Sequence, residues 1–258
     1  MKNSDQSSDT ETGYSLDQGL AVYESAMGEP YSVYARSALT ELLRSHRSVP
    51  GRCLDLACGA GHLVDYLASK GWQAYGCDLS TDMIQTARNR YPHLADRFFC
   101  ADMAEIRTEL TFDLVTVVFN SIHYLGAPQR KRFWDNVSKV IKDGGLLVSQ
   151  QNTHQAMRAF WLNRCHRWRS DDGYAFWSAR NGSVPDSVNV EKQYFQNQGD
   201  GTYRLYTAEH RYHFFPFDEM ERSLGERGMR IIDTRDGRTL QSRISDTNSI
   251  WVVARRDG

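Results

Sequence analysis

Between residues 52 and 149 the chain alternates short apolar runs with segments in which apolar side chains recur every three or four positions. The short runs predict β-strands, and the segments between them, such as the one with Leu63, Leu67 and Ala68, predict amphipathic helices. A run that is apolar at nearly every position suits a strand buried on both faces, as in a parallel sheet. The pattern therefore predicts an α/β fold with a doubly wound, mostly parallel sheet. The expected strands are 53–57, 73–77, 98–101, 112–119 and 146–150.

A further helix is expected between the last two of these strands. It should begin at Pro128 and end in the pair Gly144-Gly145, because proline favours the first helical turn and glycine the position after the last. Apolar residues at helical spacing, Phe133 and Val137 among them, give it a buried face.

The alternation breaks after Gln150. Residues 153–215 hold three of the six tryptophans and then two stretches of alternating polarity, 188–195 and 202–215, separated by a Gly-Asp-Gly turn. Alternation on both sides of such a turn predicts an antiparallel hairpin. We therefore expect an aromatic-rich helical plus antiparallel β insertion after the fifth strand.

The chain then divides into four parts. We expect a disordered tail at 1–13, the cofactor-binding core with an N-terminal helical cover at 14–152, and the insertion at 153–215. A C-terminal helix and strand pair at 216–258 completes the core. The insertion is expected to be a lid that carries substrate contacts or joins two copies in a homodimer, since large aromatic side chains suit either surface.

Composition narrows the classes of partner. The 258 residues include 31 basic and 32 acidic side chains, for a net charge of -1, so the chain has no general attraction for nucleic acid or an anionic membrane. It has no apolar run of about 20 residues, and its start lacks the apolar core of a secretory signal. The five cysteines are odd in number and form no C-x-x-C pair. We expect a cytoplasmic protein with reduced thiols, no disulfide framework and no metal site.

A glycine-rich turn follows the first strand. Asp55 lies near the strand end, Gly59 and Gly61 follow, and a helix begins at once, so a ligand can approach bare backbone at the carboxyl edge of the sheet. A dinucleotide loop would place a third glycine at Val64, so valine there argues against NAD. An acid at Asp55 suits a cation such as the α-ammonium of S-adenosylmethionine (SAM).

Two more acids end the next strands. Asp78 ends the second strand, where a carboxylate can accept hydrogen bonds from both ribose hydroxyls. Asp102 ends the third and can accept from the adenine amino group, with Met103 covering the ring.

These segments resemble the class I SAM-dependent methyltransferases, of the small-molecule, glycine or aminosugar N-methyltransferase-like type. The motifs are LDLACGAGHL, GCDLSTDMI, CADM, FDLVTVVFNSIHYL and IKDGGLLV, and the resemblance covers residues 14–152 and the closing helix and strand pair. Ala57 departs from the usual glycine. The resemblance implies a Rossmann-like core, SAM as cofactor with S-adenosylhomocysteine as product, and no metal. The implied cofactor residues are Asp55, Ala57, Gly59, Gly61, Asp78, Leu79, Met83, Asp102, Met103 and Asn120; Met83 could equally be plain core.

The fourth strand delivers His123 to the carboxyl edge, beside the place that the methyl group must occupy. An unperturbed histidine pKa of roughly 6.5 suits proton transfer near neutral pH, so His123 is the candidate general base; the alternative is a histidine that caps the following loop. Tyr14 and Tyr23 belong to a segment resembling the N-terminal tyrosine motif of the family, with Glu24 where aspartate is usual. They are expected to face the methionine carboxylate or the acceptor, or else simply to pack over the sheet.

The candidate acceptor pocket is aromatic. Its expected residues are Tyr124, His154, Trp161, Trp168 and Trp177. The leading hypothesis is methyl transfer to N or O of a small-molecule acceptor. Alternatives are an RNA or protein methyltransferase, encouraged only by HRWR at 166–169, a non-catalytic SAM-binding protein, and an NAD-dependent reductase. The sequence leaves open the identity of the acceptor.

Overall fold

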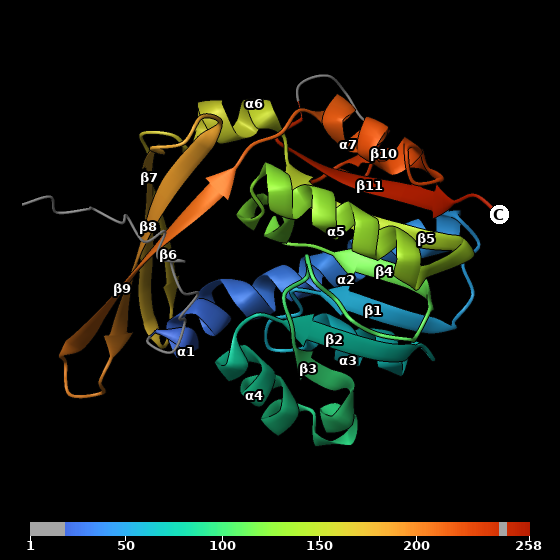
Figure 1. Cartoon of the computed structure of the whole chain (residues 1–258). Helices are drawn as coiled ribbons and strands as arrows, with labels where there is room; N and C mark the ends of the chain where they lie inside the picture. The colour runs from blue at the N-terminus through green and yellow to red at the C-terminus, as the bar shows by residue number, and fades with distance from the viewer. Residues whose placement is uncertain (1–18, 243–246) are drawn as a thin grey trace, which may run out of the picture.

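A seven-stranded sheet forms the centre of the computed structural model, which describes residues 19–242 and 247–258 (Figure 1). Its order is β10-β11-β5-β4-β1-β2-β3. The first five strands along the chain pair in parallel, β11 pairs antiparallel with β5, and β10 pairs antiparallel with β11. The predicted α/β fold class is therefore confirmed. The strands are β1 (Arg52–Leu56), β2 (Gln73–Asp78), β3 (Phe98–Cys100), β4 (Phe112–Val117), β5 (Ile141–Asn152), β10 (Met229–Asp236) and β11 (Ser249–Arg256).

Helices cover both faces of this sheet because neighbouring strand residues point to opposite sides. Cys53 and Leu114 pack with helices α2, α3 and α4, whereas Leu54 and Val115 pack with α5 and α7. These helices are α2 (Glu29–Ser45), α3 (His62–Ser69), α4 (Thr81–Arg90), α5 (Ala127–Val140) and α7 (Phe217–Gly225). The shorter helical elements are α1 (Leu20–Tyr23), η1 (Glu24–Gly28), η2 (Pro92–Arg97), η3 (Ser121–Tyr124), α6 (His154–Ala156) and η4 (Met157–Trp161).

The predicted end of the helix before β5 was wrong. Helix α5 ends at Val140, and the glycine pair lies inside β5, where Gly144 has φ 77°. The β4–β5 register shifts between Phe112 and Leu114, opposite these glycines. A glycine with positive φ forms a bulge in a strand as readily as it ends a helix, and the sequence does not distinguish the two.

A second, antiparallel sheet follows β5 and lies beside the main sheet (Figure 1). Its order is β6-β7-β8-β9, with β6 (Cys165–Ser170), β7 (Gly173–Asn181), β8 (Ser187–Asn197) and β9 (Tyr203–His213). The predicted hairpin corresponds to β8 and β9. The aromatic segment before it, expected to be helical, is helical only at 154–161, and Trp168 and Trp177 lie on strands.

One face of this second sheet packs against the start of the described chain. Val22 and Met27 join Val190 and Tyr194 of β8 in one apolar cluster, together with Met83 from α4. Of the helices in the described residues, none is long and apolar enough to cross a membrane. The expected tail at 1–13 and Tyr14 lie outside the described residues.

Candidate active site

A cavity of about 1780 Å³ lies between the two sheets. Its walls include the residues that follow β1, β2 and β4, which are the carboxyl ends of three neighbouring parallel strands, and the inward face of the second sheet. Open α/β sheets bind ligands at this edge because their loops and helix starts converge there.

The glycine loop turns the chain from β1 into α3 through left-handed backbone. Ala57, Gly59 and Gly61 have φ values of 56°, 54° and 82°. A β-carbon on Gly61 would lie 2.7 Å from the Phe98 ring, whereas one on Gly59 would meet only Met83 Sδ, at 4.0 Å. Gly61 therefore allows close packing and Gly59 leaves backbone open to the cavity. Ala57 adopts a conformation that costs a non-glycine residue about 1–2 kcal/mol.

Val64 fills the place that a third loop glycine would leave open. A β-carbon on Gly76 of β2 would lie 2.7 Å from Val64 Cγ2, so the valine packs directly on the strand backbone. The helix and strand are already in contact through a branched side chain, which is not the packing of a dinucleotide loop.

Asp55 is a buried carboxyl on the cavity wall. It is 1% exposed, and Oδ1 accepts a hydrogen bond of 2.5 Å from the Thr116 hydroxyl. Burial raises its pKa to about 7, the Thr116 bond opposes this, and the charge of Asp78 adds to it. A buried carboxylate with one neutral partner gains most from a cation, because the cation would offset its lost hydration.

Asp78 is held by the loop that it faces. Its two oxygens accept 2.9 Å hydrogen bonds from the backbone N–H groups of Gly59 and Ser80, while burial raises its pKa against these bonds. Each carboxylate oxygen has a second lone pair, so the group can still accept from a diol. Leu79 beside it is 58% exposed on the cavity wall, although it is apolar.

A third acid lies further along the same edge. Asp102 accepts a hydrogen bond of 2.8 Å from the Ala104 N–H, and Met103 is buried beside it. Both line the cavity. An acceptor carboxylate next to a buried apolar side chain can bind a flat, partly polar ring.

The end of β4 is strained. Phe119 and Asn120 have φ values of 57° and 61°, which are unusual for residues other than glycine and tend to occur at functional sites. Asn120 Oδ1 accepts a 2.5 Å bond from the Asn152 N–H, and the Phe119 ring stacks on Tyr31 with centroids 4.1 Å apart. The prediction missed Tyr31, which donates to the Gln150 side chain, because no local pattern ties residue 31 to residue 119.

The N-terminal helical cover is joined to the core by hydrogen bonds to the buried carboxylate of Glu24. Glu24 Oε2 accepts 2.7 Å bonds from His62 Nε2 and Arg90 Nη1. Burial raises the Glu24 pKa, but His62 and Arg90 outweigh this, so the net shift is downward. The preceding residue, Tyr23, lines the cavity with its ring 6.3 Å from Phe119.

His123 lies on the cavity wall and is 2% exposed. Its Nδ1 is 2.9 Å from the His213 carbonyl oxygen, and its Nε2 is 3.2 Å from the Asn152 carbonyl oxygen. Burial lowers its pKa to about 4, although the two carbonyls favour the charged ring. Neither nitrogen turns a lone pair toward the cavity, so the ring joins η3 to the ends of β5 and β9.

The second sheet supplies an aromatic wall. Trp177 lies between Trp161 and Trp168, with ring centroids 6.1 and 5.0 Å away. Tyr124 faces this wall from η3, and its hydroxyl lies 3.0 Å from that of Tyr212. His154 does not line the cavity; its ring packs 5.8 Å from Phe214.

One basic side chain in this wall was missed. Lys192 is 1% exposed and donates a 3.1 Å hydrogen bond to the Tyr124 hydroxyl. The sequence contained a signal for it, because the alternation of β8 places Lys192 on the same inward side as Val188, Val190 and Tyr194.

The cavity thus brings together most of the predicted residues. Those that line it are Tyr23, Asp55, Ala57, Gly59, Asp78, Leu79, Met83, Asp102, Met103, Asn120, His123, Tyr124, Trp161, Trp168 and Trp177. Gly61 and His154 do not line it, and Tyr14 is outside the described residues. No group of three or more His, Cys, Asp or Glu side chains within residues 19–242 and 247–258 is placed to hold a metal ion.

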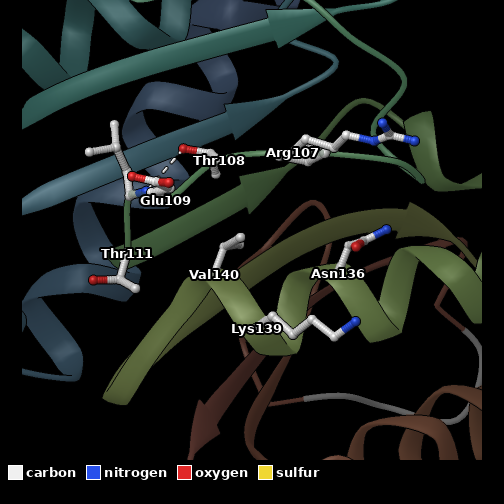
Figure 2. Close-up of a pocket in the computed structure, with 9 residues that line it drawn as sticks. Arg107, Thr108, Glu109, Thr111, Asn136, Lys139 and Val140 are labelled. Atoms are coloured by element: carbon white, nitrogen blue, oxygen red, sulfur yellow. Dashed lines mark hydrogen bonds between the residues drawn. The ribbon is translucent and has the colours of Figure 1, made fainter.

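A smaller cleft of about 620 Å³ lies at the opposite edge of the sheet. It lies between residues 106–111, which lead into β4, and helix α5, from which Asn136 and Lys139 line it (Figure 2). This edge carries the amino ends of the parallel strands, and the cleft contains none of the predicted site residues.

Comparison with known proteins agrees with this geometry. Residues 53–145 match the family described as methyltransferase domain. The chain is 25% identical over 238 residues to a Geobacillus sp. (strain WCH70) protein named as a methyltransferase, covering 91% of this chain and 96% of that one. It is 35% identical over 122 residues to the dTDP-3-amino-3,6-dideoxy-alpha-D-glucopyranose N,N-dimethyltransferase of Streptomyces fradiae, covering 45% and 46% of the two chains.

The fold has a close match among solved structures. The crystal structure of a SAM-dependent methyltransferase from Clostridium acetobutylicum superposes with a TM-score of 0.81 and 21% identity, over 92% of this chain and 97% of that chain. The fold therefore matches that of class I methyltransferase structures. Over residues 53–145 the chain thus matches a methyltransferase domain, and over most of its length it is similar to a protein named as a methyltransferase, as the sequence predicted.

Proposed function

We propose that the enzyme transfers the methyl group of SAM to N or O of a small-molecule acceptor. The observation that carries this is the single cavity shared by the glycine loop and the aromatic face of the second sheet. The relative from Streptomyces fradiae is named for an aminosugar substrate, which supports a small polar acceptor here. An enclosed wall of aromatic rings is typical of small-molecule sites.

The cofactor half of the cavity fits SAM. Asp55 is assigned to the α-ammonium, Asp78 to the ribose hydroxyls, and Asp102 with Met103 to the adenine. The open backbone at Gly59 allows close approach, and the exposed apolar Leu79 would be covered by a bound ring. Ala57, Met83 and Asn120 complete this wall, while Gly61 supports it from behind.

The protein contributes mainly alignment. SAM, when bound, supplies a methyl group on an activated sulfonium. Trp161, Trp168, Trp177 and Tyr124 orient the acceptor, and Tyr23 faces the methionine carboxylate or the acceptor. We assign His123 to positioning, because both of its nitrogens face backbone carbonyls. Holding the acceptor in line can contribute several kcal/mol.

A macromolecular acceptor has weaker support. The HRWR segment lies on β6, where His166 and Trp168 face inward and Arg167 and Arg169 are exposed. The His166 ring lies 4.5 Å from Trp161, so half of the segment belongs to the aromatic wall. The net charge of -1 adds no attraction for RNA. We further propose that no metal takes part.

Location and assembly complete the proposal. All five cysteines are free and three of them are buried, which supports a location in the reducing cytoplasm. Tyr203 and Leu205 on the outward side of β9 are about half exposed and support a homodimer through the insertion. Light scattering of wild type and Leu205→Arg tests the dimer; equal masses at all concentrations would refute it.

The proposed function is tested by binding and by turnover. Calorimetry should show SAM binding and no NADH binding, and Asp78→Asn should lose roughly 1.5–3 kcal/mol of binding free energy per charge-assisted hydrogen bond. Incubation with SAM and a panel of small amines and alcohols, aminosugars included, should give one product heavier by one methyl group. Methylation of RNA or protein alone would overturn the proposal.

A further inference from the structure

Lys192 lies at the bottom of the acceptor half of the cavity. Its neighbours in register are Trp177 on β7 and Ala208 on β9. Nζ lies 4.1 Å from the centroid of the Trp177 ring, and the rings of Tyr124 and Tyr212 are 5.8 and 5.7 Å away. The amine is thus enclosed by three aromatic rings, and it lies within hydrogen-bond distance of the Tyr124 hydroxyl.

Among the described residues, no carboxylate pairs with this amine. The titratable groups that face it are Tyr124 from η3, His210 and Tyr212 from β9, and Tyr194 on its own strand. Within the part of the chain that the structure describes, Lys192 forms no ion pair. Burial lowers the pKa of Lys192 to about 7. Burial and the positive charge of Lys192 together lower the pKa of His210 to about 2. A buried amine without a counter-ion favours its neutral form, which has a lone pair.

Tyr124 connects the amine with the space above it. Its side chain is half-buried, lines the cavity, and lies immediately after His123 at the end of η3. The hydroxyl contacts both Lys192 and Tyr212, and either tyrosine can donate in the second contact. A hydroxyl can pass on a proton, because it both donates and accepts.

We propose that Lys192 is the terminal proton acceptor of the methyl transfer, reached through the Tyr124 hydroxyl. This rests on the proposed function. The acceptor gives its N–H or O–H proton to Tyr124 Oη, and the Tyr124 proton moves to the lone pair of Lys192 Nζ. The acceptor's electron pair forms the bond to the methyl carbon as the carbon–sulfur bond breaks and leaves its pair on sulfur. Lys192 later releases its proton to solvent.

The proposal restricts the acceptor. An aliphatic amine is mostly protonated at neutral pH, and a hydroxyl keeps its proton, so either must lose one proton for its methylation. A base inside the cavity lets both enter in their ordinary form. An acceptor that enters as a free base would need neither Lys192 nor Tyr124.

The first experiment needs no acceptor. Protein labelled with ¹³C at lysine Cε is titrated by NMR, and the Lys192 signal is assigned as the one missing from Lys192→Met. The Lys192 signal should titrate with a midpoint near pH 7. Its midpoint should be the same in Lys139→Met, a control variant at an exposed lysine on the opposite edge of the sheet. A midpoint near the ordinary value of about 10.4 would overturn the proposal.

The second experiment measures turnover of an accepted substrate against pH. In wild type, kcat should rise with a midpoint near 7, and Lys192→Met should lower kcat about 10²-fold, abolish this rise and leave the SAM Kd unchanged. Lys192→Arg should not restore it, because arginine stays charged. Tyr124→Phe should show the same loss.

Two outcomes separate the possible failures. A higher acceptor KM in Lys192→Met, with kcat and its pH profile retained and rescue by Lys192→Arg, would make Lys192 an anchor for an anionic group and would overturn the proposal. If wild type binds SAM but methylates no small molecule, the proposed function is wrong, and the role of Lys192, which rests on it, is wrong as well. A Lys192 titration midpoint near pH 7 would then show that the error concerns the class of acceptor and not the environment of the amine. Thermal unfolding of Lys192→Met confirms that the variant is folded.

Discussion

The burial of Asp55 predicts that SAM binding is linked to a proton. With a pKa of about 7, this carboxyl is largely protonated below pH 6 in the free enzyme. A cation beside it would lower that pKa, so the ligand selects the ionised form and releases the proton on binding. Affinity should therefore rise with pH and level off above 7.

The size of the effect follows from the ionised fraction. At pH 5.5 this is roughly 3% and at pH 7.0 roughly half, so SAM affinity should increase about 15-fold, or ~1.6 kcal/mol, between these values. The range lies below the pH at which the ligand's own amino group loses its proton. Binding at pH 6 should release about 0.9 proton, measured by calorimetry in buffers of different ionisation enthalpy.

Asp55→Asn isolates this carboxyl. The amide oxygen can still accept from the Thr116 hydroxyl, so the variant should fold, bind SAM more weakly by roughly 1.5–3 kcal/mol at pH 7.5, and lose the pH dependence. Asp78→Asn is the matched control: it should weaken binding at every pH and retain the slope that Asp55 causes. An unchanged slope in Asp55→Asn, or a flat profile in wild type, would refute the assignment of Asp55 to the ammonium.

Three further predictions concern the loop, the histidine and the aromatic wall. Ala57→Gly should raise the free energy of unfolding by up to about 1 kcal/mol, because relief of the left-handed strain exceeds the added entropy of the unfolded chain. Ala60→Gly in the same loop should lower the free energy of unfolding. Urea titrations that rank the two variants in the reverse order would contradict this prediction. His123→Ala should lower the free energy of unfolding by about 2–4 kcal/mol while the pH profile of kcat is retained; loss of that profile would instead identify His123 as the base. Trp168→Ala should raise the acceptor KM and leave the SAM Kd unchanged, and Phe176→Ala, one strand away on the outward face, should change neither; steady-state kinetics showing equal effects would argue against an acceptor wall on this face.

The sequence predicted those features of the fold that depend on residues close together in the chain. The alternation of apolar runs predicted the main sheet because each parallel strand is buried on both faces, and the acids at 55, 78 and 102 were found because carboxyl ends of parallel strands share one edge. The Gly144-Gly145 pair misled because the same glycines serve a helix end and a bulge. Strands β6 and β7 were missed because aromatic residues suit helices and strands alike when polar residues interrupt them.

The contacts that assign roles are long-range. Whether His123 can act as a base depends on the carbonyls of Asn152 and His213, which are 29 and 90 residues away in sequence. No spacing rule reports that both ring nitrogens meet backbone. The environment of Lys192 likewise depends on Tyr124, which comes from η3 rather than from the second sheet. The sequence predicted that His123 lies at this edge, but it did not single out Lys192 or tell which side chain keeps a lone pair.

The antiparallel sheet has an evolutionary consequence. Its four strands come from one uninterrupted stretch, 165–213, while the acids that face the cofactor half all come from residues before 103. The chain enters this stretch after η4 and leaves it before α7, so substitutions or even replacement of the stretch would alter one wall of the cavity and leave the other wall's backbone intact. Under the proposed function, substitutions on the cavity side of β6–β9 would change the acceptor wall while the three acids of the other wall stay in place, so the two specificities could diverge at different rates.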